Sequence, residues 1–156
     1  MQNKFIKLVA SLSLPFVAGS IGSYFTIPSI DSWYQTLNKP IFSPPDWVFG
    51  PAWTILYVLM GISFYLVWSS KSSKNKNQAV KLFLIQLTLN ASWSIIFFGL
   101  HNPSFAFINI IALWIVIYMT IRAFTTPSKT AAYLLYPYLA WVSFATILNL
   151  SIVLLN

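Results

Sequence analysis

Polar and aromatic side chains recur together, at helical spacing, in the apolar parts of the chain. Gln86, Asn90, Trp93 and Phe97 follow one another at steps of four, three and four residues, which places them on one face of a helix. A buried amide costs free energy unless it has a partner, so Asn90, beside Trp93 and Phe97, is a candidate ligand contact. An aromatic-walled cavity with one or two amides suits a flat hydrophobic ligand.

Two further stripes carry aromatic residues at helical spacing. One helical face would carry Trp53, Tyr57, Gly61, Phe64 and Trp68, and a second would carry Trp141, Ala145 and Asn149. Such stripes commonly pack one helix against another, and the spacing alone leaves that alternative open. For Asn109 and Asn149 we expect hydrogen bonds between helices, because an amide in hydrocarbon needs a partner.

The remaining chemistry of the chain is restricted. It has no cysteine, one histidine (His101) and two acids, Asp31 and Asp46, in or beside one connection. No nucleophile–base–acid set, glycine-rich phosphate loop or metal-binding cluster can be assembled from its motifs. We therefore expect no required cofactor and no metal. Proton-coupled pumps usually carry an acid within the bundle, so a proton relay is disfavoured.

The composition predicts one integral membrane domain over residues 1–156. The chain is 58% hydrophobic and 7% charged, whereas soluble domains carry about 25% charged residues. Apolar runs near the roughly 20 residues that span a bilayer occur at 5–27, 47–69, 79–100, 104–124 and 130–154. We predict an all-α bundle of five transmembrane helices with a short helical lid over 28–46. Pro28 should end the first helix and Pro137 should bend the fifth.

The basic residues predict an orientation in the lipid bilayer. Eight fall on the side of the N-terminus: Lys4, Lys7, Lys71, Lys74, Lys76, Lys81, Arg122 and Lys129. Only Lys39 falls on the other side. Cytoplasmic loops are enriched in Lys and Arg, so we expect a cytoplasmic N-terminus and an outward C-terminus. The net charge of +7 is thus explained by membrane orientation, and we expect no nucleic-acid partner.

The stretch from Lys39 to Trp53 differs from a plain span. It holds four of the nine prolines, so it should be stiff and non-helical as far as Pro45. Asp46 would then cap the start of the second helix. We interpret this stretch as a lid on the outer face. In the first span, the pairs Ala18/Gly22 and Gly19/Ser23 would let another helix approach closely, within the chain or in a dimer; Ala91 to Ile95 are a second candidate dimer contact.

Several blocks resemble a known family. They are Pro44-Pro45-Asp46-Trp47, Gly50-Pro51-Ala52-Trp53-Thr54-Ile55-Leu56-Tyr57, Gln86-Leu87-Thr88-Leu89-Asn90-Ala91-Ser92-Trp93, Phe97-Phe98-Gly99, Leu134-Leu135-Tyr136-Pro137-Tyr138-Leu139-Ala140-Trp141 and Phe144-Ala145-Thr146-Ile147-Leu148-Asn149. In this order and spacing the chain resembles the translocator protein family in its bacterial type, also called tryptophan-rich sensory proteins and formerly peripheral benzodiazepine receptors.

The resemblance implies a receptor-like membrane protein, usually a homodimer in the bacterial cell membrane, with a capped pocket. Family members bind porphyrins such as protoporphyrin IX and haem-type tetrapyrroles, and also isoquinoline carboxamides and benzodiazepines. The resemblance and the stripes together give the following expected ligand-binding residues: Trp33, Tyr34, Pro44, Trp53, Tyr57, Asn90, Trp93, Phe97, Tyr138, Trp141 and Ala145. Lys39 would pair with a porphyrin propionate.

Two alternative functions follow from the same resemblance. Some bacterial members promote light-dependent oxidative degradation of protoporphyrin IX, which implies catalytic roles for Trp53 and Trp141, with porphyrin as substrate rather than ligand. Indole can donate an electron, and this chemistry needs no acid or base. The third reading is a porphyrin or sterol transporter. Animal members carry a tyrosine and an arginine in a cholesterol-recognition pattern where this chain has Leu150 and Leu154, so the sequence gives no support for cholesterol binding.

Overall fold

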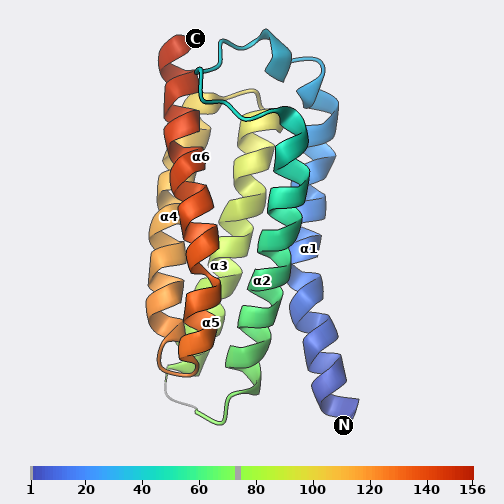
Figure 1. The fold of residues 1–156 in the computed structure, drawn as a ribbon, viewed down its shortest axis with the longest axis vertical. Helices are drawn as coiled ribbons and strands as arrows, with labels where there is room; N and C mark the ends of the chain where they lie inside the picture. The colour runs from blue at the N-terminus through green and yellow to red at the C-terminus, as the bar shows by residue number, and fades with distance from the viewer. Residues whose placement is uncertain (1, 73–74) are drawn as a thin grey trace.

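Long helices make up almost all of the structure, a computed structural model that describes residues 2–72 and 75–156. The helices are α1 (Gln2–Ile30), α2 (Phe49–Ser69), α3 (Lys76–Ser94), α4 (Pro103–Phe124), α5 (Lys129–Leu134) and α6 (Tyr136–Leu155). Two short 3₁₀ helices, η1 (Tyr34–Thr36) and η2 (Asp46–Val48), and one π-helical turn, η3 (Ile95–Gly99), complete the order. Five helical segments are long and apolar enough to cross a membrane, and Figure 1 shows them side by side. The predicted all-α five-helix bundle is confirmed.

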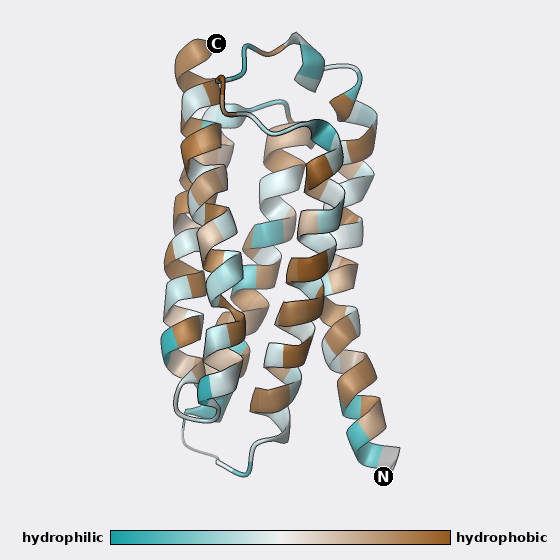
Figure 2. Cartoon of the chain, viewed as in Figure 1, coloured by the Kyte–Doolittle hydropathy of each residue, from teal (hydrophilic) through white to brown (hydrophobic). Residues whose placement is uncertain are grey.

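Hydropathy follows the bundle as expected for a membrane protein. In Figure 2 hydrophobic residues run along the helices, and hydrophilic ones gather at the two ends, with a few inside α3. The N-terminus and the α2–α3 and α4–α5 connections lie at one end of the bundle (Figure 1). The C-terminus and the α1–α2 connection lie at the other. The basic residues therefore separate between the ends as the sequence predicts, except that Lys74 lies outside the described residues.

Two prolines act differently from each other in the spans. We predicted that Pro28 ends the first helix, and this is wrong. Helix α1 contains both Pro15 and Pro28 and continues to Ile30. Membrane helices tolerate proline where neighbouring groups satisfy the freed backbone. Pro137 does interrupt its span, because α5 stops at Leu134 and α6 restarts at Tyr136 with the proline in its first turn. There proline costs little, since the first N–H groups of a helix have no intrahelical partner.

The lid runs from Asp31 to Val48 and is less helical than expected. Only η1 and the turn at η2 are helical, and the prolines keep the segment between them extended or turned, as predicted. Our prediction that Asp46 caps α2 is wrong: α2 has Val48 at its N-cap and no side-chain cap. Asp46 begins η2, and its Oδ2 accepts a hydrogen bond from Gln35 Nε2 at 2.7 Å.

Glycines let α1 lie close to α2 and α3. A Cβ at Gly19 would overlap the ring of Tyr57 in α2, and one at Gly22 would lie 2.9 Å from Ser94 Oγ in α3. Gly61 of α2 in turn lies against the backbone of Leu12. Gly19 and Gly22 of the first span therefore serve contacts within the chain, whereas Ser23 is exposed. A dimer contact through this span stays a prediction.

Candidate ligand-binding pocket

A pocket of about 760 Å³ lies inside the bundle beneath the lid. Side chains from α1, α2, α3, η3 and α6 line it, together with Tyr34, Asp46 and Trp47 of the lid. No residue of α4 or α5 is among the lining residues that the structure describes. This volume falls within the roughly 300–1,000 Å³ typical of small-molecule sites.

Aromatic rings form most of the wall. Trp53 of α2 stacks on Tyr57 with ring centroids 5.4 Å apart, and it meets the edge of Trp141 of α6 at 6.5 Å. Across the pocket, Trp93 stacks on Phe97 at 5.0 Å. All five rings line the pocket. Rings in these offset and edge-to-face arrangements support one another and present flat faces and edges to a planar guest.

An amide network closes the deep end. Asn90 and Tyr57 are the lining residues farthest from the lid on α3 and α2. The Tyr57 hydroxyl donates to Asn90 Oδ1 at 3.3 Å, and Asn90 Nδ2 donates to the Tyr138 hydroxyl at 3.0 Å. These bonds satisfy part of the buried amide and fix its orientation. One N–H and one lone pair of Asn90 remain for a ligand.

The tryptophans differ in whether the protein uses their indole N–H. Trp93 Nε1 donates to Asn149 Oδ1 at 3.0 Å, and Asn149 Nδ2 donates to the Pro103 carbonyl at 2.9 Å, as expected for an interhelical amide. For Asn109 we expected a hydrogen bond to another helix. This prediction is wrong for its oxygen, because the buried Oδ1 has no hydrogen-bond partner among the described residues. For Trp53 and Trp141, no described residue accepts from the indole N–H. These two rings can therefore donate to a guest without breaking a protein contact.

A π-helical turn shapes the wall beneath the lid. In η3 the Leu100 N–H donates to the carbonyl of Ile95, five residues back, at 2.9 Å. Across this wider turn the consecutive residues Ile96, Phe97 and Phe98 are all buried. Such turns are frequent at functional sites. Phe98 lines the pocket, and the sequence reasoning missed it because it assumed α-helical spacing throughout.

The lid is anchored at two points. Tyr34 is 4% exposed, and its ring centroid lies 6.3 Å from that of Phe97 and 5.7 Å from that of Phe98. Burial raises the pKa of the Tyr34 phenol; a hydrogen bond with Ser43 lowers it, and the nearby carboxyl of Asp46 raises it. At the other anchor, Asn38 N–H donates to Asn156 Oδ1 at 2.9 Å, and Asn156 Nδ2 donates to the Asn38 carbonyl at 3.0 Å.

The structure brings most of the predicted site residues to this pocket. The lining includes Tyr34, Trp53, Tyr57, Asn90, Trp93, Phe97, Trp141 and Ala145. Tyr138 does not line it and instead lies behind Asn90, fully buried. Trp33 and Pro44 lie in the lid, as expected, but are not among the lining residues, so their contact with a ligand stays a prediction. Trp33 stacks on His101 at 4.4 Å, outside the pocket.

Some lining residues were not predicted from the sequence. Phe49, at the first turn of α2, meets the edge of Trp141 at 6.1 Å. It lies four residues before Trp53 and so continues the same helical face, which we had begun only at Trp53. On the side of α1 and α2 the lining also includes Tyr24, Ile27 and Trp47, whose exposed fractions are 77%, 68% and 75%. The pocket is therefore bordered by exposed side chains between these two helices.

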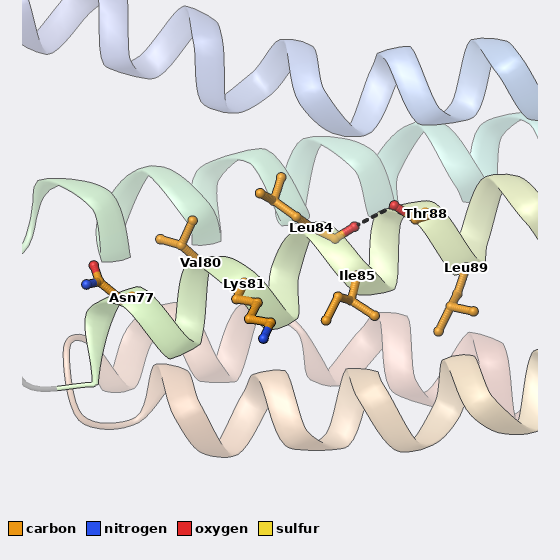
Figure 3. Close-up of a pocket in the computed structure, with 7 residues that line it drawn as sticks. All are labelled: Asn77, Val80, Lys81, Leu84, Ile85, Thr88 and Leu89. Carbon is orange, nitrogen blue, oxygen red and sulfur yellow. Dashed lines mark hydrogen bonds between the residues drawn. The ribbon is translucent and has the colours of Figure 1, made fainter.

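A second concavity is a shallow groove along the outer face of α3. Figure 3 shows its lining side chains, all from this one helix: Asn77, Val80, Lys81, Leu84, Ile85, Thr88 and Leu89. Thr88 donates its hydroxyl to the Leu84 carbonyl at 3.0 Å, within the helix. No aromatic ring and no predicted site residue lies in this groove, so the pocket beneath the lid is the candidate site.

Fold and pocket together define a class: an integral membrane protein of five apolar helices, four of which line an aromatic cavity beneath a loop. Comparison with known families identifies the class more closely. The model of the TspO/MBR family matches residues 11–155, and the chain belongs to this family.

Individual relatives agree over nearly their whole length. The chain is 47% identical to the tryptophan-rich protein TspO of Archaeoglobus fulgidus, over 97% of both chains. It is 46% identical to the tryptophan-rich protein TspO of Chlorobaculum tepidum, over 100% of this chain and 99% of the relative. The human translocator protein is 39% identical, over 86% of this chain and 81% of its own length.

Proposed function

We propose that this protein binds tetrapyrroles such as protoporphyrin IX, and similar planar apolar ligands, in the pocket beneath the lid. The observation that supports this most directly is the wall of Trp53, Tyr57, Trp93, Phe97 and Trp141 around a cavity of about 760 Å³. Flat aromatic faces favour a flat aromatic guest, and removing its apolar surface from water supplies most of the affinity. Isoquinoline carboxamides and benzodiazepines would compete for the same space.

The polar groups of the pocket would orient the ligand. Asn90 retains one N–H and one lone pair at the deep end, and Trp53 and Trp141 retain their indole N–H groups higher up. A few fixed donors in an otherwise apolar cavity define the pose more than they add affinity. The tetrapyrrole is in this reading a ligand, and its binding requires no metal ion from the protein.

A pocket-filling substitution tests the site. Ala145 lines the cavity on α6, whereas Ile147 of the same helix is 57% exposed. In darkness, titration of the purified protein with protoporphyrin IX should quench tryptophan fluorescence. Ala145→Phe should weaken binding at least about tenfold, because the added ring occupies the cavity. The matched control Ile147→Phe should bind like the wild type, and equal affinity of both variants would refute the proposal.

Light-dependent oxidative degradation of the bound porphyrin is a second candidate function. It is favoured by the edge-to-face pair of Trp53 and Trp141, 6.5 Å apart in the wall, whose indole N–H groups donate to none of the described residues. Light would excite the porphyrin, and dioxygen would be reduced as the porphyrin is oxidised. Each indole would donate one electron to the excited porphyrin or to an oxygen species and later regain one from the porphyrin, so that the protein is unchanged. Trp53→Phe with Trp141→Phe should keep dark binding within about threefold, since phenyl rings preserve the apolar wall. It should abolish the loss of porphyrin absorbance under light; a double variant that still degrades porphyrin would exclude this role.

A further inference from the structure

The mouth of the pocket carries a carboxylate in its lining. Among the described residues that line the pocket, the one charged side chain is the carboxylate of Asp46. It lies in the turn where the lid joins α2, beside the lining residues Trp47 and Phe49. The remainder of the lining is aromatic, aliphatic, hydroxyl or amide. Any charge on a ligand at this end is therefore placed near a carboxylate.

A hydrogen bond fixes this carboxylate in the lid. Gln35 Nε2 donates to Asp46 Oδ2 at 2.7 Å, which ties η1 to η2. None of the described residues donates to Oδ1. Asp46 is only partly exposed, so its charge is less screened than that of a fully solvated side chain.

The cation of the lid, Lys39, lies behind Gln35, which bridges it to Asp46, and does not face the pocket. Lys39 Nζ donates to the Tyr34 carbonyl at 3.0 Å and to Gln35 Oε1 at 3.4 Å, and it lies 4.5 Å from the centroid of the Tyr34 ring. Lys39 is not among the lining residues. The ion pair with a propionate that the sequence suggested would therefore require Lys39 to leave three contacts.

We propose that Asp46 is a specificity-determining residue, which disfavours ligands that bring a carboxylate to the mouth of the pocket and favours neutral or donor-bearing edges there. This inference rests on the proposed binding function and refines its ligand class. Two like charges several ångströms apart at a partly desolvated site repel appreciably, and a neutral ester or an N–H group at the same place does not. A tetrapyrrole with esterified or otherwise neutral side chains thus suits this mouth better than a dianionic one.

The test compares two probes of equal ring structure in darkness. Protoporphyrin IX carries two propionates and its dimethyl ester carries none. The dissociation constants of both would be measured by tryptophan quenching, at low ionic strength, for the wild type, Asp46→Asn and Asp31→Asn. Asp46→Asn keeps an oxygen for the bond from Gln35 and removes the charge. Asp31, the other acid of the chain, is exposed and does not line the pocket.

The quantity that decides is the ratio of acid to ester dissociation constants, compared between variants. Differences in the partitioning of the two probes into detergent cancel in this comparison. Asp46→Asn should lower the ratio by about threefold to tenfold, and Asp31→Asn should leave it unchanged. In the wild type, added salt should also lower the ratio, because ions screen the repulsion.

Two results would overturn the inference. One is an equal ratio of acid to ester dissociation constants in all three proteins, whatever the response of the wild type to salt. The other is an equal loss of affinity for both probes in Asp46→Asn, which would make the residue structural. If neither probe binds to any of the proteins, the proposed function itself fails, and this inference with it.

Discussion

Gly19 shows how one residue sets the shape of the pocket wall. It lies so close to Tyr57 that a Cβ would be 2.8 Å from Cζ of the ring. Gly19→Ala should push that ring away and weaken its bond to Asn90, at a cost of about 1–3 kcal/mol. Thermal unfolding in detergent measures the change. Gly50→Ala is the matched control, since nothing lies within 4 Å of its added methyl; equal effects of the two changes would contradict the packing described here.

Replacing Asn109 should stabilise the protein, in contrast to Gly19→Ala, which should destabilise it. Its buried Oδ1 has no hydrogen-bond partner among the described residues, and an unsatisfied buried polar atom costs about 1–3 kcal/mol. Asn109→Leu should therefore raise the unfolding temperature. Asn149→Leu should lower it, because Asn149 accepts from Trp93 and donates to Pro103. A destabilised Asn109→Leu protein would mean that this amide has a partner in the folded protein.

At this scale, side-chain spacing predicted much of the site. Asn90, Trp93, Trp141 and Ala145 line the pocket because they lie on regular helical faces, which sequence periodicity reveals. Residues in irregular backbone were harder to place. Phe98 reaches the lining through the π turn, while Trp33 leaves it to stack on His101, whose backbone has a positive φ of 51°. Neither feature has a periodic signature in the sequence.

Among the elements, the lid is tied to the end of α6. Asn156 accepts from the N–H of Asn38 and donates to its carbonyl, and Asn38 Nδ2 donates to the Leu155 carbonyl at 3.2 Å. These bonds join residues 117 or 118 positions apart, so no local pattern could have predicted them. The prolines of the lid predicted its irregular backbone, but they did not predict its contact with the end of α6.

Removing the hydrogen bonds between the lid and Asn156 should speed ligand exchange. Asn156→Ala removes two of the hydrogen bonds that hold the lid, so the dissociation rate of protoporphyrin IX should rise about threefold to tenfold. Stopped-flow dilution in darkness measures that rate. Ser151→Ala is the control, because the Ser151 hydroxyl bonds only within its own helix, to Ile147. An unchanged rate in Asn156→Ala would show that this contact does not hold the lid closed.

For the molecule as a whole, the two ends of the bundle differ in charge. The start of α1, the end of α2, the end of α4 and the start of α5 lie at the end that contains the N-terminus (Figure 1). The first three of these carry or adjoin Lys4, Lys71 and Arg122, and α5 begins with Lys129, whereas Lys39 is in the lid. We propose that the N-terminal end faces the cytoplasm of a bacterial cell and that the lid faces outward. The number of spans was predictable from hydropathy, because a run of apolar residues long enough to cross a bilayer is a strong local signal.

A protease test in intact cells checks this orientation. A tag fused after Asn156 should be cleaved by externally added protease, whereas a tag fused before Met1 should be protected until the cells are lysed. The distribution of Lys and Arg is the physical reason for this expectation. The reverse pattern would place the lid in the cytoplasm and would require tetrapyrroles to arrive from that side.

The location of a bound tetrapyrrole tests the central claim most directly. Zinc protoporphyrin IX can be used for this purpose, since anomalous diffraction from crystals of the complex reveals the position of its zinc. We predict a single strong peak inside the bundle, between Trp53, Trp93 and Trp141 and on the lid side of Asn90. A peak outside the bundle instead, for example along the groove on α3 that Figure 3 shows, would contradict the account.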